Sequence, residues 1–236
     1  ACGVCHSDLS VISGTFPAMG PTVLGHEAAG IVLELGEGVT SLEVGDHVIL
    51  TPNAACGTCA YCIKGLQSVC ASSMVIATSM LPDGTSRLSR NGETVFHGLG
   101  VAAWADEIVV HANGAIRIDK DLPLDVACVI GCAVQTGVGA AINTADIDPG
   151  DSVLVLGAGG VGICIVQGAA IAGAAQIIVS DPSESRREQA MRFGATHVID
   201  PNEQDVVSVT MGLTGVGADV AFEAVGSAAA MPTSTS

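Results

Sequence analysis

Four cysteines lie within the fifteen residues CGTCAYCIKGLQSVC, and their spacing could hold a metal ion. They are Cys56, Cys59, Cys62 and Cys70. Four thiolates complete a tetrahedral zinc shell and leave no open position, so this site would be structural. Gly57 and Gly65 allow the tight backbone that such a loop needs.

Disulfides, a redox switch and buried free thiols are the alternatives for these four cysteines. The chain has nine cysteines, an odd number, and no charged segment followed by an apolar one at Ala1, so we expect no secretory leader. Both features weigh against a disulfide framework. A closed thiolate cage is inert until it is oxidised, which weighs against a switch. We therefore predict a structural zinc.

A second metal site could be assembled from three distant segments, GVCHSD (3–8), LGHEAAG (24–30) and IGCAVQTGVG (130–139). They offer Cys5, His26 with Glu27 beside it, and Cys132. Two thiolates and one imidazole leave the fourth position of a tetrahedral zinc open, as in catalytic sites. An oxygen bound there loses its proton more easily. The three segments together predict a catalytic zinc.

A glycine loop, Gly157-Ala158-Gly159-Gly160-Val161-Gly162, follows an apolar run that reads as a strand. A helix, a second strand and Asp181, about twenty residues on, complete the context of a dinucleotide-binding fingerprint. Gly157 permits the turn, Gly159 lets the pyrophosphate approach the backbone, and Gly162 lets helix and strand pack closely. The Asp181 carboxylate can accept hydrogen bonds from the ribose hydroxyl groups. Its negative charge would repel the 2′-phosphate of NADP, which favours NAD.

Composition narrows the classes of partner. The net charge of −16 argues against nucleic acid and against anionic membrane surfaces as partners. Residues 152–180 carry no charge and are long enough for a membrane span. We interpret them instead as a buried strand, a glycine turn, a buried helix and a second strand.

Two domains must position these groups in an α/β protein. Residues 1–140 are predicted to form a β-rich catalytic domain with both zincs, and 141–226 an NAD-binding domain. We place four parallel strands near 152–156, 176–180, 197–199 and 218–222. A full dinucleotide fold has six. The tail at 227–236 is interpreted as disordered or artefactual, and the active site is expected in the cleft between the domains.

The order of these motifs resembles the zinc-dependent alcohol dehydrogenases of the medium-chain dehydrogenase/reductase family. The resemblance runs from Gly3 to about Gly226 and implies a GroES-like domain followed by a Rossmann domain, truncated after about four strands. DGTSRL with NGE (83–93) is similar to a loop of larger, dimeric members and of thiol-dependent formaldehyde dehydrogenases. Because the first strands and the last strands of the family are missing, we expect a fragment.

The resemblance implies roles for individual residues. Asp8 would orient His26, Glu27 would lie beside the catalytic metal, and Ser7 would take the proton of the alcohol. The cofactor-binding residues would be His6, Thr136, Gly157, Gly159, Gly160, Val161, Gly162, Asp181 and Arg186. Many relatives have a histidine at the position of Ser10 that passes the proton to solvent, so here the relay must end differently or use water.

The expected protein is a cytoplasmic zinc enzyme with two zincs per chain that transfers a hydride between a primary or secondary alcohol and NAD. Its partners would be an alcohol or aldehyde and, in the full-length parent, further copies of itself. One alternative is a thiol-dependent formaldehyde dehydrogenase. The other is an inactive zinc- and nucleotide-binding fragment.

Overall fold

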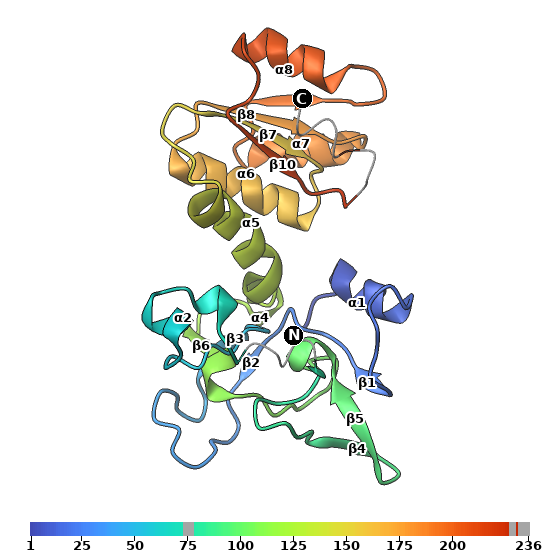
Figure 1. Ribbon diagram of the computed structural model, residues 1–236, viewed down its shortest axis with the longest axis vertical. Coiled ribbons are helices and arrows are strands. Elements are labelled where there is room, and N and C mark those ends of the chain that lie inside the picture. Colours follow the sequence, from blue (N-terminus) through green and yellow to red (C-terminus); the bar gives the residue numbers. More distant parts are fainter. Residues whose placement is uncertain (73–77, 227–229, 231–236) are drawn as a thin grey trace. The chain divides into compact units, whose positions relative to one another are not determined.

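The computed structural model describes residues 1–72, 78–226 and 230, and the chain divides into two compact units (Figure 1). Unit 1 is Ala1–Cys132 and unit 2 is Ala133–Ser236. Apart from Ala230, the predicted tail at 227–236 lies outside the described residues.

Unit 1 is built around two three-stranded sheets in its described residues. Its strands are β1 (Thr22–Val23), β2 (Ala29–Ile31), β3 (His47–Leu50), β4 (Leu88–Arg90), β5 (Glu93–His97) and β6 (Ala115–Ile118). One sheet is antiparallel with the order β2-β3-β6. The other has the order β1-β5-β4, with β1 parallel and β4 antiparallel to β5. The predicted β-rich first domain is confirmed.

The central strand β3 supplies side chains to two cores. Val48 and Leu50 pack with Leu42 in one cluster, whereas Ile49 packs with Cys128 in another. Successive side chains of a strand point to opposite faces, so an unbroken apolar run indicates a strand covered on both sides.

Short helical segments connect the strands of unit 1. They are α1 (His6–Ile12), α2 (Ala60–Ile63), η1 (Gln67–Val69), η2 (Gly98–Gly100), η3 (Ala112–Gly114), α4 (Leu124–Ala127) and η4 (Ile130–Val134), which runs into unit 2. The start of α1 is capped twice. The Ser7 N–H donates to Cys5 Sγ at 3.5 Å, and the Cys5 N–H donates to the Asp8 carboxylate at 3.1 Å. These bonds satisfy N–H groups that the first turn leaves unpaired.

Unit 2 contains a four-stranded parallel sheet. Its strands are β7 (Ser152–Leu156), β8 (Gln176–Ser180), β9 (His197–Ile199) and β10 (Val220–Glu223). Their order, β10-β7-β8-β9, is that of the first four strands of a dinucleotide-binding fold. The four predicted strands are confirmed, and the last begins two residues later than predicted.

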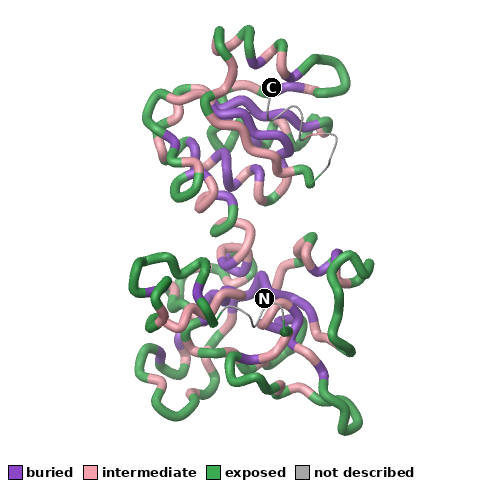
Figure 2. Tube along the Cα trace, viewed as in Figure 1, coloured by how far each residue is buried: buried purple, intermediate pink, exposed green. Residues whose placement is uncertain are grey.

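Helices cover both faces of this sheet. α6 (Gly160–Ala172) and α7 (Glu184–Arg192) pack on one face and α8 (Val206–Thr214) on the other, while α5 (Gln135–Gly139) and η5 (Ala140–Thr144) pack against α6. Val153 of β7 packs with Val166 of α6, whereas Leu154 packs with Val206 of α8. The central strands are therefore buried, as Figure 2 shows. This explains the uncharged run at 152–180 without a membrane.

A second apolar segment, Leu124–Thr144, is long and apolar enough to cross a membrane by length and composition alone. Its glycines pack closely inside each unit. A methyl group on Gly131 would lie 1.9 Å from the Leu50 carbonyl oxygen, and one on Gly137 would lie 2.6 Å from that of Val161. At both glycines the backbone of this segment is therefore packed against other parts of the protein.

Candidate functional site

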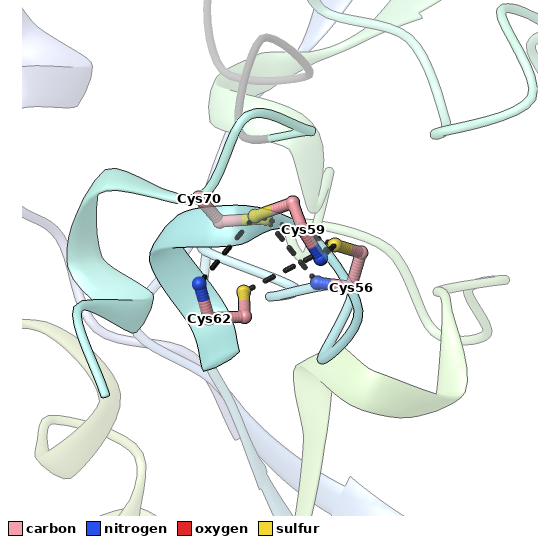
Figure 3. A group of neighbouring side chains, drawn as sticks. All are labelled: Cys56, Cys59, Cys62 and Cys70. Carbon is pink, nitrogen blue, oxygen red and sulfur yellow. Dashed lines mark hydrogen bonds between the residues drawn. The ribbon is translucent and has the colours of Figure 1, made fainter. Parts of the chain in front are cut away.

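The four-cysteine loop lies in unit 1, between β3 and β4. Figure 3 shows the side chains of Cys56, Cys59, Cys62 and Cys70 gathered around one point. Their four sulfur atoms all lie within 4.8 Å of one another. Gly57 and Gly65 have φ values of +75° and +80°, so the left-handed turns predicted for them are present.

The sulfur separations fit a zinc–thiolate centre. Cys56 Sγ lies 3.5 Å from Cys70 Sγ and 4.0 Å from Cys62 Sγ, and Cys59 Sγ lies 3.9 Å from Cys70 Sγ. A tetrahedron with Zn–S bonds of 2.3 Å has edges of about 3.8 Å. A disulfide needs about 2.05 Å, so the nine cysteines, all of them in the described residues, are free thiols.

Backbone N–H groups point at these sulfurs and favour thiolates. The Thr58 and Cys59 groups lower the pKa of Cys56 to about 5. Burial, by contrast, raises the pKa of Cys62 to about 12. Four clustered thiols cannot all ionise without a counter-charge, and a divalent cation supplies that charge.

The second cluster joins three parts of unit 1. Cys5 is the cap of α1, His26 lies between β1 and β2, and Cys132 lies in η4. Cys132 Sγ is 3.9 Å from Cys5 Sγ and 3.3 Å from His26 Nε2. All three donor atoms lie within 4.8 Å of one another. This set fits zinc with one position left for a further ligand.

Asp8 supports this cluster from behind. Its carboxylate is fully buried and lies 3.3 Å from His26 Nδ1. It also accepts the Cys5 N–H at 3.1 Å and the Gly25 N–H at 3.0 Å. A bond at Nδ1 leaves the Nε2 lone pair of the imidazole free for a metal.

Two glycines bring the ligands into place. Gly25 has φ +91°, and a methyl group there would lie 2.4 Å from the Trp104 ring. Gly131 packs against the Leu50 carbonyl and so sets the position of Cys132 beside it. Neither glycine was singled out from the sequence, because each role depends on a residue more than 70 positions away.

Charges inside the cluster are strongly coupled. Cys132 and His26 lower the pKa of Cys5 to about 3, and the Cys5 thiolate together with burial raises the pKa of Cys132. Burial lowers the pKa of His26, but Cys5 and Asp8 outweigh it and raise that pKa overall. Burial also raises the pKa of Glu27, helped by the Cys5 charge. A buried group of two thiols and two carboxyls favours a bound cation.

Ser7, Asp8 and Glu27 therefore lie at the predicted metal site together with its three ligands. Ser7 Oγ is 3.7 Å from Cys5 Sγ. Ser10 is buried, and its Oγ lies 3.5 Å from Nδ1 of the exposed His6. The structure thus pairs the serine that replaces the relay histidine with the predicted pyrophosphate-binding histidine.

The glycine loop of unit 2 has the conformation that a pyrophosphate site requires. Gly157 has φ +93°, and a methyl group on Gly162 would lie 1.9 Å from the Gly157 carbonyl oxygen. Gly159, by contrast, has no atom within 4 Å of where a methyl group would sit. Free N–H groups at the start of α6, beginning at Gly160, attract anions. The open side of Gly159 is space that a phosphate can use.

Asp181 directly follows β8 and contacts this loop. Its buried carboxylate accepts the Ala158 N–H and the Ser183 N–H, each at 2.8 Å. Arg186 Nη1 is 3.8 Å from the same carboxylate. Arg187 donates to the Asp181 carbonyl at 2.7 Å and pairs with Asp200 at 3.0 Å. The sequence interpretation noted the first arginine and missed the second.

Thr136 and Val161 belong to α5 and α6, which pack against each other. Thr136 is exposed, and its neighbour Gly137 contacts the Val161 carbonyl. Unit 2 thus holds all the predicted nucleotide-binding residues except His6, which lies in unit 1.

Comparison with protein-family models finds two matches. Residues 1–120 match the family described as "Alcohol dehydrogenase GroES-like domain", and residues 160–236 match "Zinc-binding dehydrogenase".

Individual relatives agree with these matches. The chain is 43% identical over 235 residues to the S-(hydroxymethyl)glutathione dehydrogenase of Synechocystis sp., covering 97% of this chain and 63% of that protein. An alcohol dehydrogenase zinc-binding domain protein from Burkholderia ambifaria superposes with a TM-score of 0.91 at 39% identity, covering 98% of this chain and 63% of that one. The benzyl alcohol dehydrogenase of Acinetobacter calcoaceticus gives 0.86 at 35%, with the same coverage.

Proposed function

Because the chain belongs to the zinc-binding medium-chain alcohol dehydrogenase family, we propose that it transfers a hydride from S-(hydroxymethyl)glutathione, the adduct of formaldehyde and a thiol, to NAD. The family has a structural four-cysteine zinc site, a catalytic Cys/His zinc site and a nucleotide cofactor, and the chain carries both metal sites. The chain spans about 63% of the length of the relatives it matches, so the activity of the whole enzyme is part of the proposal.

The observation that supports this choice of substrate is the 43% identity with a curated dehydrogenase of that adduct. It favours the thiol-dependent alternative of the sequence analysis over simple alcohols. The reaction removes a hydride from carbon and a proton from the hydroxyl oxygen, and leaves a thioester and NADH.

Zinc, when bound, supplies a Lewis acid, and NAD supplies the hydride acceptor. Cys5, His26 and Cys132 would hold the metal, and Asp8 keeps the His26 proton on Nδ1. His26 is 2% exposed, so the site excludes bulk water on that side.

We assign to Ser7 the role of taking the substrate proton. Its Oγ lies 3.7 Å from Cys5 Sγ, at the edge of the metal site. A hydroxyl can accept one proton while it donates its own, so it can pass charge outward without ionising. Glu27 is buried beside the same cluster, and its raised pKa favours the neutral carboxyl.

The nucleotide would be held by unit 2. Gly159 and the first N–H groups of α6 would take the pyrophosphate, and Asp181 the ribose hydroxyls. The negative charge of the Asp181 carboxylate favours NAD over NADP. His6, Thr136, Val161 and Arg186 remain proposed cofactor contacts.

A second candidate is the oxidation of neutral primary alcohols. The chain has a net charge of −16 and eight basic side chains, whereas glutathione is anionic. Overall repulsion slows the approach of an anion. One relative, 35% identical, is a benzyl alcohol dehydrogenase.

An assay that follows NADH separates these candidates. The zinc-loaded chain is given NAD with formaldehyde, with formaldehyde plus glutathione, or with benzyl alcohol alone, and Cys132→Ser is the control. We expect turnover of formaldehyde only when glutathione is present. Faster turnover of benzyl alcohol would favour the second candidate. Cofactor binding without turnover of either substrate would favour the non-catalytic zinc- and nucleotide-binding alternative.

A cytoplasmic location and a homo-oligomeric parent enzyme are part of the same proposal. Both are proposed from the family alone.

A further inference from the structure

Trp104 is the one tryptophan of the chain and contacts two segments that carry metal ligands. Its indole Nε1–H donates to the Gly3 carbonyl at 3.2 Å, two residues before Cys5. Its ring lies against Gly25, the residue before His26, so closely that a methyl group there would be 2.4 Å from Cδ1.

The backbone around Trp104 joins the same segments. The Ala103 N–H donates to the Gly25 carbonyl at 2.9 Å, and the Trp104 N–H donates to the Leu24 carbonyl at 2.8 Å. The Gly3 N–H in turn donates to the Glu27 carbonyl at 2.8 Å. The two segments that carry Cys5 and His26 are thus hydrogen-bonded to each other. Both are also bonded to the segment of Trp104, which supplies no metal ligand.

We propose that Trp104 is a positioning residue, which holds Cys5 and His26 at the separation that a shared zinc ion needs. The ligands come from positions 5, 26 and 132, so their separation is not set by local sequence. Indole combines a ring wide enough to cover a glycine Cα with an N–H donor at its far edge. Phenylalanine offers the ring alone.

A purely structural role is the competing explanation. Trp104 follows Ala103, which belongs to the buried core of unit 1, and its own side chain is 39% exposed. If it only packed, its loss would lower the stability of unit 1 and affect both metal sites together. A positioning role predicts a change at the Cys5–His26–Cys132 site alone. The inference rests on that site and not on the proposed substrate, so the two can fail separately.

Zinc release tests the difference. The chain is loaded with two zincs, and release to a coloured chelator is followed over time. The four-cysteine site is closed and should release slowly, whereas the three-ligand site, with its open position, should release first. Cys132→Ser, which removes one ligand of the latter, identifies its phase.

Trp104→Phe keeps the ring and loses the N–H donor, and Trp104→Leu loses both. We expect the first variant to release zinc from the three-ligand site about two- to tenfold faster, the range of one lost hydrogen bond, and the second to release it faster still. The slow phase and the melting temperature of Trp104→Phe should stay close to those of the unmodified chain. Phe193→Leu in unit 2 is the control for loss of a half-exposed aromatic side chain.

Gly25→Ala approaches the same contact from the other side, because its methyl group would displace the Trp104 ring. It should also accelerate the fast phase. Gly45→Ala, which has the same left-handed backbone (φ +88°) but no atom within 4 Å of the new methyl group, should not. Unchanged fast release in both tryptophan variants would overturn the proposal, and so would equal acceleration of both phases. If Gly25→Ala does not fold, Trp104→Phe decides alone.

Discussion

The Asp8 carboxylate and the His26 imidazole face each other inside unit 1, with Oδ1 3.3 Å from Nδ1 although the residues are eighteen positions apart. The same carboxylate accepts the N–H groups of Cys5 and Gly25. One buried side chain therefore connects the first ligand, the second ligand and the turn between them.

Asp8→Asn should weaken zinc binding at the three-ligand site by about 10- to 100-fold, the range seen when a partner behind a metal-bound histidine is removed. The amide keeps the shape but loses the charge, and it turns a donor toward one of the N–H groups that Asp8 accepts. Competition with a chelator of known affinity measures the change.

Asp46→Asn is the matched control. Asp46 is also buried and accepts the Glu43 N–H at 2.9 Å, but it lies outside the metal cluster. It should lower stability without changing zinc affinity. Equal zinc affinity in the two variants would show that the contact between Asp8 and His26 does not support the metal.

Two cysteine variants test the metal count. Cys59→Ser should reduce the zinc content from two per chain to one and lower the melting temperature, because bound metal contributes to folding. Cys132→Ser should also leave one zinc, at the four-cysteine loop, with a smaller effect on unfolding. Elemental analysis and thermal melting measure both. A single zinc in the folded, unmodified chain would contradict the two-site assignment.

Local sequence was enough to predict much of this arrangement. Each of β7, β8 and β9 is a short apolar run within a few residues of a turn, and Cys56 to Cys70 carry their spacing within one loop. The metal ligands Cys5, His26 and Cys132 were found through their residue types and order. In these cases the signal lies in neighbouring residues or in a recognisable chemistry.

The contacts that hold the ligands in place were not predicted. Trp104 on Gly25 and Gly131 on Leu50 join positions about 80 apart, and neither glycine differs from a turn glycine in sequence. The hydrogen bonds from the Ala158 and Ser183 N–H groups to the Asp181 carboxylate were not predicted either, although those residues lie only 23 and two positions away. The one feature of the sequence that could have drawn attention to Trp104 is that the chain has no other tryptophan.

Stability should depend on pH through His97. This imidazole is 1% exposed, and burial, with the Arg87 charge as a smaller cause, lowers its pKa below the ordinary value. Its Nε2 accepts a hydrogen bond from the backbone N–H of Arg87, and only the unprotonated nitrogen can do so. The unfolded chain takes up a proton at about pH 6.5, before the folded chain does, so stability is full above that pH and falls as the pH is lowered.

Urea unfolding at about pH 7.5 and about pH 5.5 measures this loss, each unit of pKa depression corresponding to about 1.4 kcal/mol. His97→Gln should reduce the difference between the two pH values. His111→Gln, at an exposed histidine, should leave it unchanged. An identical pH dependence in His97→Gln and the unmodified chain would contradict the assignment.

Two glycines of one loop should respond in opposite ways to the same change, because one is closed in by the protein and the other is open. Gly162→Ala places a methyl group 1.9 Å from the Gly157 carbonyl oxygen, which is backbone and cannot move aside cheaply. It should therefore destabilise unit 2.

Gly159 has φ −74°, ordinary for alanine, and no atom lies within 4 Å of where a methyl group would sit. Gly159→Ala should keep the melting temperature and weaken NAD binding by tenfold or more, since the methyl group occupies the approach of the pyrophosphate. Calorimetric titration with NAD, beside thermal melting, measures both effects. Unchanged NAD affinity in a folded Gly159→Ala variant would mean that the phosphates do not approach this loop.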